Sequence, residues 1–353
     1  MYLKNWDWPQ LKQLKHFRFE YTRGAGSSLP LIFFLLAGCS LTTEPEIDSF
    51  ATALANYATP TAAAVTEPPP APTVQPDPYQ PSGKIIYVCQ ISHQIWHNDL
   101  CMINADGSGF QRITENEAAN QFFPSFAPDG NSIVFSSNQE GSHDIYERSL
   151  DGTEIRLTFS GENYAPAISP DGSWIVYTHS YGENLGQSQL WLMGRLGEND
   201  LPLTSLSGGA WDPEWSPDGK QILFASMVSG SPQLFKVNAD GSDPVQVTNL
   251  KGIRGRNDWS PDGKWLSTYI GTNWNREIVI FDTQGENLTV LTNGGNNLAP
   301  SFSPDGNWIV FTGYRDHPRE DHGCEIYIIR VDGTGLRRLT DNDYCDWQPR
   351  WGR

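Results

Sequence analysis

Positive charge is scarce in this chain. Its 353 residues include 24 lysines and arginines against 41 aspartates and glutamates, so the formal net charge is −17. A nucleic-acid-binding protein needs a basic surface to neutralise phosphates, and electrostatic docking on anionic lipid needs one too. The composition therefore argues against both partners and is typical of a soluble exported domain.

Short catalytic motifs are also missing. The sequence contains no G-x-S-x-G elbow, Walker loop, H-E-x-x-H or G-x-G-x-x-G pattern. These motifs mark hydrolase, phosphate-binding, metalloprotease and dinucleotide sites. We therefore expect a non-enzymatic protein with no catalytic residues, no cofactor and no metal, although carboxylates scattered in the sequence still allow a hydrolase.

One apolar run stands out near the start of the chain. Five basic residues precede SLPLIFFLLAGC, Ser28 to Cys39, which is too short to span a bilayer alone but suits a signal-peptide core. Its end, Leu36-Ala37-Gly38-Cys39, resembles the lipobox of bacterial lipoproteins. We expect residues 1–38 to be a signal peptide and Cys39 to be lipidated; an ordinary cleaved signal or an anchor helix is the alternative.

The segment 39–82 is rich in Pro, Thr and Ala and has few large apolar residues. Such a composition cannot bury enough surface to offset chain entropy, and its prolines favour extended backbone. We expect a disordered tether between a lipid anchor and a folded domain, which predicts an extracytoplasmic, membrane-anchored location in a bacterial cell envelope.

A repeat organises residues 83–353. Pro-Asp-Gly occurs five times, with Asp129, Asp171, Asp218, Asp262 and Asp305 spaced by 42, 47, 44 and 43 residues. Six segments end in an apolar residue followed by Thr, at Thr114, Thr158, Thr204, Thr248, Thr292 and Thr340. A period in the forties with short strands is typical of propeller blades.

Each unit predicts four antiparallel strands. Ser-Pro-Asp-Gly fits a type I turn between the first two strands, since Pro fixes φ and Asp and Gly suit the next two positions. A polar loop leads to a third strand, and a second turn such as Asp240-Gly241 leads to a strand ending in Thr. Both faces of these strands are apolar, as expected for sheets packed between neighbours.

These repeats resemble the TolB-type β-propeller, also called the WD40-like or PD40 repeat. The first unit lacks its opening strand, and the C-terminal DWQPRWGR supplies one, with Pro349 and Trp351 aligned with Pro300 and Phe302. We therefore predict an all-β, six-bladed propeller whose C-terminal strand completes the first blade. The expected blades are residues 83–120 plus 345–353, 121–163, 164–209, 210–254, 255–297 and 298–344.

The face opposite the Pro-Asp-Gly turns holds the candidate binding residues. Two positions before the strand-one proline the blades carry mostly aromatic residues, and charged residues follow two of these positions. The predicted aromatic rim for a ligand or partner is Phe122, Tyr164, Trp211, Asp212, Arg256 and Trp347. Such rings could stack a sugar or hold a peptide; the alternative is that they pack between blades.

Four cysteines remain besides Cys39. Cys89 and Cys101 lie across a predicted hairpin. Cys324 opens the third strand of the last blade and Cys345 lies in the loop before the closing strand, so we expect the disulfides 89–101 and 324–345. Zinc is the alternative for Cys89, His93, His97 and Cys101. Loop Gly313 to Glu325 carries acidic residues and histidines, and Thr340 to Asp346 could offer oxygens to calcium, though without EF-hand spacing.

We hypothesise a non-enzymatic, membrane-tethered propeller that binds a protein, peptide or glycan at the envelope. The alternative is an envelope hydrolase or lyase that uses carboxylates in the funnel. A purely structural module is a third possibility.

Overall fold

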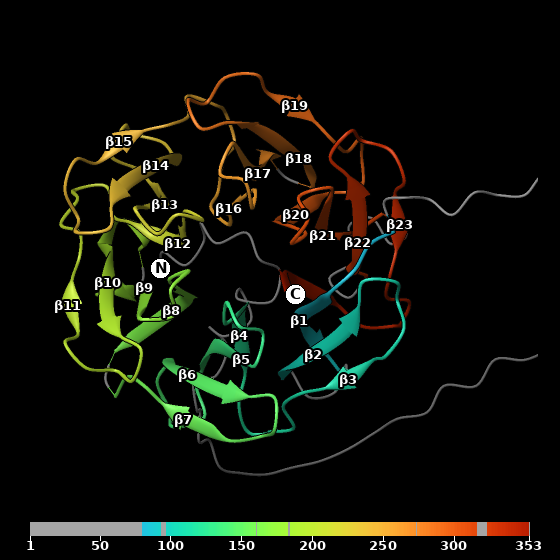
Figure 1. Cartoon of the computed structure of the whole chain (residues 1–353), viewed down its shortest axis with the longest axis horizontal. Coiled ribbons are helices and arrows are strands. Elements are labelled where there is room, and N and C mark those ends of the chain that lie inside the picture. The colour runs from blue at the N-terminus through green and yellow to red at the C-terminus, as the bar shows by residue number, and fades with distance from the viewer. Residues whose placement is uncertain are drawn as a thin grey trace, which may run out of the picture. The chain divides into compact units, whose positions relative to one another are not determined.

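Six four-stranded antiparallel sheets, arranged around a ring, confirm the predicted propeller (Figure 1). The computed structural model describes residues 80–92, 97–159, 161–182, 184–272, 274–315 and 323–352. The predicted signal peptide, Cys39, the tether up to residue 79 and His93 lie outside the described residues, as do residues 316–322 of the Gly313–Glu325 loop.

The blades are numbered from the first sheet along the chain. Blade 1 contains β24 (Asp346–Gly352), β1 (Lys84–Gln90), β2 (Asn98–Asn104) and β3 (Gln111–Arg112). Blade 2 contains β4 (Gln121–Phe126), β5 (Ser132–Ser137), β6 (Asp144–Ser149) and β7 (Glu154–Arg156). Blade 3 contains β8 (Glu162–Ile168), β9 (Trp174–Ser180), β10 (Ser188–Gly194) and β11 (Leu201–Pro202).

The second half repeats this arrangement. Blade 4 contains β12 (Trp211–Trp215), β13 (Gln221–Ser226), β14 (Gln233–Asn238) and β15 (Val245–Gln246). Blade 5 contains β16 (Asp258–Trp259), β17 (Trp265–Thr272), β18 (Asn275–Asp282) and β19 (Thr289–Val290). Blade 6 contains β20 (Asn297–Phe302), β21 (Trp308–Gly313), β22 (Glu325–Arg330) and β23 (Arg337–Arg338).

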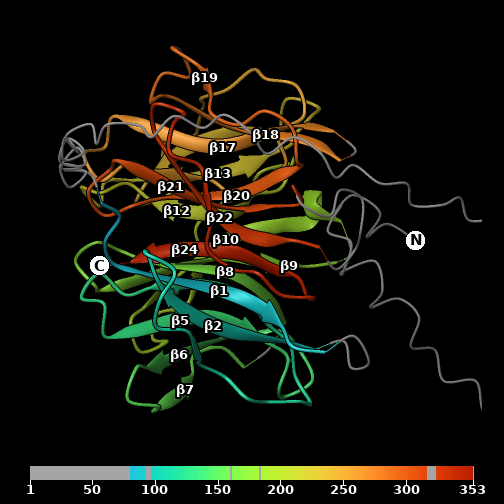
Figure 2. The same cartoon turned by 90° about the vertical axis from the view of Figure 1, so that its right-hand side faces the viewer.

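Helix is almost absent from this part of the chain. The described residues contain a single short 3₁₀ helix, Leu185–Gln187, and no helix long and apolar enough to cross a membrane. In the side view the strands of the blades run between the same two faces (Figure 2).

The C-terminal strand closes the ring as predicted. β24 pairs antiparallel with β1, with Lys84 opposite Gly352 and Cys89 opposite Asp346. The Trp351 indole N–H also donates to the carbonyl of Ser82 at 2.8 Å. Because β24 completes the sheet of the first blade, β1 is paired on both sides and the two ends of the propeller are joined in one sheet.

The repeated threonine has the same role in all six blades. Its Oγ1 accepts the N–H of a residue in the first half of the third strand, at 2.9 Å in each blade. It also donates to a carboxylate or amide oxygen near the start of that strand, from Asp99, Asp144, Gln189, Gln233, Glu277 and Glu325. A buried hydroxyl that makes both bonds fixes the outer strand, which explains the period of this residue.

The Pro-Asp-Gly aspartates form turns, as the sequence pattern indicates. In blade 3, Asp171 Oδ1 accepts the N–H of Ser173 at 3.0 Å and the Ser169 hydroxyl at 2.5 Å. Gly172 adopts φ 75°, a conformation that glycine reaches without strain. The same turn in blades 2, 4, 5 and 6 places all five aspartates on one face as structural residues.

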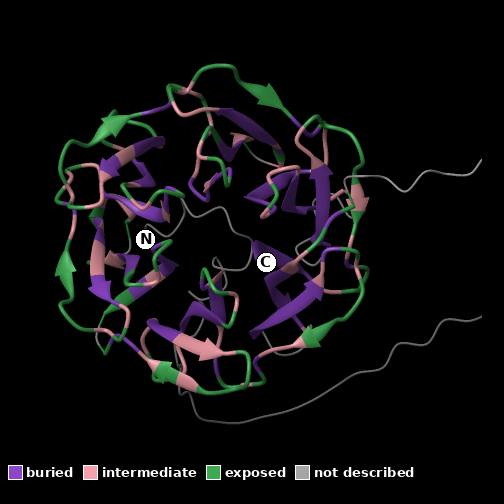
Figure 3. Cartoon of the chain, viewed as in Figure 1, coloured by how far each residue is buried: buried purple, intermediate pink, exposed green. Residues whose placement is uncertain are grey.

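Burial decreases from the centre of the ring outward (Figure 3). The second and third strands of the blades are largely buried, for example SIVFSS of β5, whereas the short outer strands β11, β15 and β19 are exposed. Apolar side chains between neighbouring sheets form the core, and this packing holds the inner strands in place around the axis.

Candidate binding site at the ring centre

Every blade has a residue with a left-handed backbone in its innermost strand or, in blade 5, two residues before that strand. Phe123, Ala165, Asp212, Arg256, Ala299 and Gln348 have φ between 40° and 53°. In the five blades with a resolved bulge, the pairing of strand one with strand two shifts at this position. A bulge bends the strand and redirects its side chains. It therefore decides which residues reach the ring centre, the region where the six inner strands meet.

Two contacts join opposite blades across this centre. Arg350 of blade 1 pairs with Glu214 of blade 4, Nη2 to Oε2, at 3.0 Å. The Arg256 guanidinium of blade 5 lies over the Phe123 ring of blade 2, 5.2 Å from its centroid. Blades 1 and 4, and likewise 2 and 5, stand three places apart in a ring of six, so these side chains reach across the axis.

A network of shorter contacts surrounds the two arginines. Arg350 donates to the carbonyl of Asn257 at 3.1 Å and lies 3.9 Å from Asp258 Oδ2. The backbone N–H of Arg256 donates to Asp212 Oδ2 at 3.0 Å, and Asn257 Nδ2 donates to the backbone carbonyl of Asp212 at 2.9 Å. Asn257, which replaces the proline of the other blades, thus ties blade 5 to blade 4.

Several buried polar atoms at the centre have no partner among the described residues. They are Asp212 Oδ1, Arg256 Nε and Nη2, Asn257 Oδ1 and Gln348 Nε2. The four residues are 7%, 3%, 0% and 0% exposed. A buried donor or acceptor left unpaired costs about 1–3 kcal/mol, and more when it is charged. Such a set, with donors and acceptors side by side, is what a polar ligand would satisfy.

The charged groups of the centre are shifted from their ordinary pKa values. Burial raises the pKa of Glu214 to about 7 against the opposing effect of Arg350. Burial also raises the pKa of Asp212 and of Asp258. Burial and the positive charge of Arg350 lower the pKa of Arg256 to about 9. The centre can therefore exchange a proton near neutral pH.

The predicted aromatic rim divides into two groups. Asp212 and Arg256 lie at the ring centre. Phe122, Trp211 and Trp347 are 3%, 1% and 2% exposed and pack in the core, with Phe122 and Trp347 edge to face at 5.8 Å. These three rings are therefore buried, as in the alternative that they pack between blades. Ligand binding by the predicted rim residues stays a prediction.

Tyr164, the fourth aromatic residue, is only partly buried. Its hydroxyl contacts His143 Nδ1 at 3.1 Å and donates to the carboxylate of Glu162. His143 in turn lies 5.9 Å from the Phe122 ring. Tyr164 therefore belongs to a small polar cluster between blades 2 and 3, and its ring also packs edge to face on Phe123, with centroids 6.1 Å apart.

Both predicted disulfides are present. Cys89 is bonded to Cys101 within blade 1, and Cys324 to Cys345 across the loop before β24. The two cysteines of the alternative zinc site, Cys89 and Cys101, form the first of these bonds. His97 is buried beside Asp99, with Nε2 to Oδ2 at 3.4 Å. The segment from Cys89 to Cys101 is therefore cross-linked by a disulfide next to β24, the strand that closes the ring.

The Thr340–Asp346 loop uses its oxygens internally. Asn342 donates to Asp346 through Nδ2 at 2.8 Å and to Glu325 through its N–H at 2.9 Å. Thr340 donates to Glu325 at 2.5 Å. In the part of the chain that the structure describes, no three metal-ligating side chains gather.

Sequence reasoning missed Glu214, Asp258, Arg350 and Gln348. The first three share one strand position, directly after the strand-one proline or its Asn257 substitute, where blades 2, 3 and 6 have Ser125, Ala167 and Ser301. Charged residues in the innermost strand, where other repeats have small ones, are a signal that could have found them.

Comparison with known proteins agrees with the propeller fold. The family described as the TolB beta propeller domain matches residues 70–185 and 157–352. An uncharacterised protein of Agrobacterium fabrum is 32% identical over 64% of this chain and 60% of its own length. A TolB homolog of Chlorobium chlorochromatii is 29% identical over 28% of this chain and 31% of its own length.

Among solved structures, TolB from Acinetobacter baumannii superposes with a TM-score of 0.67 at 26% identity, over 76% of this chain and 66% of that one. This chain thus spans less than two thirds of the length of all three proteins. The family match covers most of the chain, including every described blade. The chain belongs to the TolB β-propeller domain family.

Proposed function

We propose that this chain is a non-enzymatic propeller, held at the envelope membrane by a lipid on Cys39, whose ring centre binds an extended segment of a partner protein. The observation that carries the proposal is that the buried atoms Nε and Nη2 of Arg256 and Oδ1 of Asp212 have no hydrogen-bond partner among the described residues. Membership of the TolB propeller family supports an envelope-associated binding role.

The chemistry of the centre favours a peptide segment. Arg256 offers N–H donors that suit a carboxylate or carbonyl, while Asp212 and Asn257 offer acceptors for N–H groups. A peptide presents both kinds of group at short spacing along its backbone. Hydrogen bonds to a charged partner contribute about 1.5–3 kcal/mol each, so the pairing of Arg256 alone could govern affinity.

Capture of the partner tests the proposal. The full chain, tagged, is expressed in its host as wild type, Arg256→Gln and Arg195→Gln, and the envelope fraction is analysed by quantitative mass spectrometry. Arg195 is a matched control because it pairs with Glu147 at the junction of blades 2 and 3, away from the centre. We expect a protein that wild type and Arg195→Gln recover and Arg256→Gln loses. Identical recovery by all three folded variants would refute the central site.

The tether is tested separately. Cys39→Ser removes the thiol that would carry the lipid, and stable anchoring needs acyl chains whose burial contributes about 0.8 kcal/mol per methylene. We expect the wild-type chain in the membrane fraction and the variant in the soluble fraction. Equal membrane retention of both would exclude lipid anchoring at this cysteine.

A hydrolase is the second candidate, and one observation favours it. Glu214, whose pKa is raised to about 7, and Asp258 both lie beside Arg350, and shifted carboxylates at one site are typical of acid–base catalysis. The test is fragment release from isolated cell-envelope material between pH 5 and 8. Release by wild type that Glu214→Gln abolishes would support an enzyme; no release by wild type would exclude it for these substrates.

A further inference from the structure

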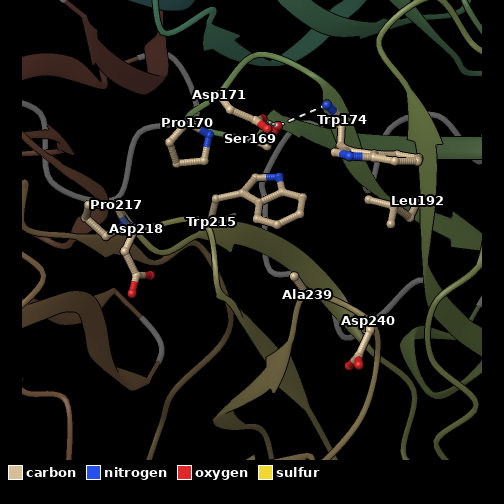
Figure 4. Close-up of a pocket in the computed structure, with 11 residues that line it drawn as sticks. Ser169, Pro170, Asp171, Trp174, Leu192, Trp215, Pro217, Asp218, Ala239 and Asp240 are labelled. Carbon is tan, nitrogen blue, oxygen red and sulfur yellow. Dashed lines mark hydrogen bonds between the residues drawn. The ribbon is translucent and has the colours of Figure 1, made fainter.

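Grooves between neighbouring blades open on the face of the Pro-Asp-Gly turns. The groove between blades 3 and 4 has a volume of about 630 Å³, and Trp174, Leu192 and Trp215 are among its lining residues. In Figure 4, Trp174 and Leu192 stand on one side and Pro217 on the other, with Trp215 between them. We call it the Trp174 groove.

An equivalent groove lies between blades 5 and 6. It has a volume of about 650 Å³ and is lined by Trp265, Ile280, Phe302 and Val331. Trp265 follows its turn at the same position as Trp174. The two tryptophans are 37% and 39% exposed, unlike Trp211 and Trp347 in the core. We call it the Trp265 groove.

Two other junctions are bridged by the chain's own cations. Between blades 2 and 3, Arg195 pairs with Glu147 and donates to Ser132 Oγ at 3.0 Å. Between blades 4 and 5, Lys236 donates to the carbonyl of Thr283 at 3.3 Å. In the Trp174 and Trp265 grooves, apolar residues take these places, and neither groove has a lysine or arginine among its lining residues.

Blade 6 shows what this tryptophan position accepts. Trp308 stands there, directly after the last Pro-Asp-Gly turn, and is 1% exposed. The guanidinium groups of Arg330 and Arg337 lie 5.0 Å and 4.8 Å from its ring. The chain thus covers one of its three equivalent tryptophans with arginine, and leaves the other two open.

Negative charge borders the Trp174 groove. Asp171, Asp218 and Asp240 all line it. Each uses Oδ1 to accept hydrogen bonds within its own turn, and those bonds lower the carboxyl pKa, so all three are ionised at neutral pH. A cation over the indole face would therefore gain from the ring and from nearby carboxylates together.

We propose that the Trp174 and Trp265 grooves bind arginine side chains of an extended segment of a partner protein, each guanidinium stacking on the tryptophan as Arg330 and Arg337 do on Trp308. Two grooves on one face would let a segment with spaced arginines bind at both, which raises overall affinity without new contacts. This site lies on the face opposite the start of strand one and does not depend on the function proposed for the ring centre.

Indole N–H signals in the nuclear magnetic resonance spectrum of the full chain provide the test. The probe is an acetylated, amidated pentapeptide Gly-Arg-Gly-Arg-Gly, and its control replaces both arginines by citrulline, which keeps the shape without the charge. Trp174→Phe and Trp265→Phe assign the two signals. We expect saturable shifts of both signals with the arginine peptide, none with citrulline, and no shift of buried Trp308.

A charge variant separates electrostatics from stacking. Asp240→Asn keeps the turn acceptor and removes one carboxylate from the Trp174 groove only, so Trp265 serves as an internal control. We expect roughly twofold to fivefold weaker binding at Trp174 and unchanged binding at Trp265. Four results would overturn the proposal: equal shifts with citrulline, no shift at about 10 mM peptide, shifts with an uncharged oligosaccharide in place of the peptide, or equal affinities in the Asp240→Asn variant.

Discussion

Replacing Arg350 by Met should destabilise the ring in a pH-dependent way. Arg350 is 7% exposed and is the positive partner of Glu214 at 3.0 Å and of Asp258 at 3.9 Å. Removing one partner of a buried pair leaves an uncompensated charge, which costs about 3–5 kcal/mol. For a domain of this size that corresponds to a melting temperature lower by roughly 6–20 °C.

The pH dependence follows from the direction of the pKa shifts. Burial raises the pKa of Glu214 from 4.5 to about 7, and that of Asp258 also rises. A carboxyl with a raised folded-state pKa favours the folded state at low pH, and this contribution is lost as pH rises through the folded value. Without Arg350 both pKa values rise further, because its positive charge no longer opposes the effect of burial. Both carboxyl groups then take up protons more readily, and protonation removes the uncompensated charge as the pH falls. The loss of stability caused by Arg350→Met should therefore be smaller at pH 5 than at pH 8.

Urea unfolding of wild type and Arg350→Met at pH 5 and pH 8 measures this effect. Lys264→Met is the control, since Lys264 pairs with Asp262 at 3.1 Å on the surface with 76% of its side chain exposed. Exposed pairs contribute about 0–1 kcal/mol, so the control should change little at either pH. An Arg350→Met deficit that is the same at both pH values, or no larger than the control's, would refute the ion-pair reasoning.

Two further stability predictions follow from the closure and the repeated threonine. Replacing both Cys324 and Cys345 by Ser should lower the free energy of unfolding by about 3 kcal/mol, because their bond spans 21 residues; a urea midpoint unchanged by reduction of the wild type would contradict this. Thr248→Val should cost about 1–3 kcal/mol, because it leaves the N–H of Leu234 without its acceptor and removes one of the two hydrogen bonds that Gln233 Oε1 accepts. Exposed Thr289→Val should change stability by no more than about 0.5 kcal/mol. Equal effects of the two threonine substitutions would show that the buried hydroxyl has no special role.

Much of the fold was readable from the sequence because its signals are local and repeated. Each Ser-Pro-Asp-Gly specifies its own turn by hydrogen bonds within five residues, as Ser169 and Asp171 illustrate. The closing strand was identifiable because Pro349 and Trp351 repeat a pattern present in other blades. The two disulfides were predictable because the repeat places the cysteines of each pair close together. Cys89 and Cys101 face each other in one hairpin, and Cys324 and Cys345 lie beside the strand that closes the ring.

Only part of the candidate site was suggested by the sequence. Asp212 and Arg256 were among the predicted rim residues and lie at the ring centre, whereas the rings of Trp211 and Trp347 lie in the core. The reason is a left-handed backbone at Asp212, Arg256 and Gln348. Local patterns give no warning of positive φ at residues other than glycine, and a shift of one residue reverses which side chains face the partner. The ion pair between Arg350 and Glu214 joins residues that are far apart in the sequence and meet only in the closed ring, so local sequence patterns could not predict it.

The most direct test of the account is the affinity of the captured partner segment for the ring centre. Calorimetric titration of that segment against the full chain, as wild type and Arg256→Gln, should give a dissociation constant at least tenfold larger for the variant. This is the loss expected when a charge-assisted hydrogen bond worth about 1.5–3 kcal/mol is removed. Equal dissociation constants for two equally folded proteins would contradict the claim that the ring centre is a binding site.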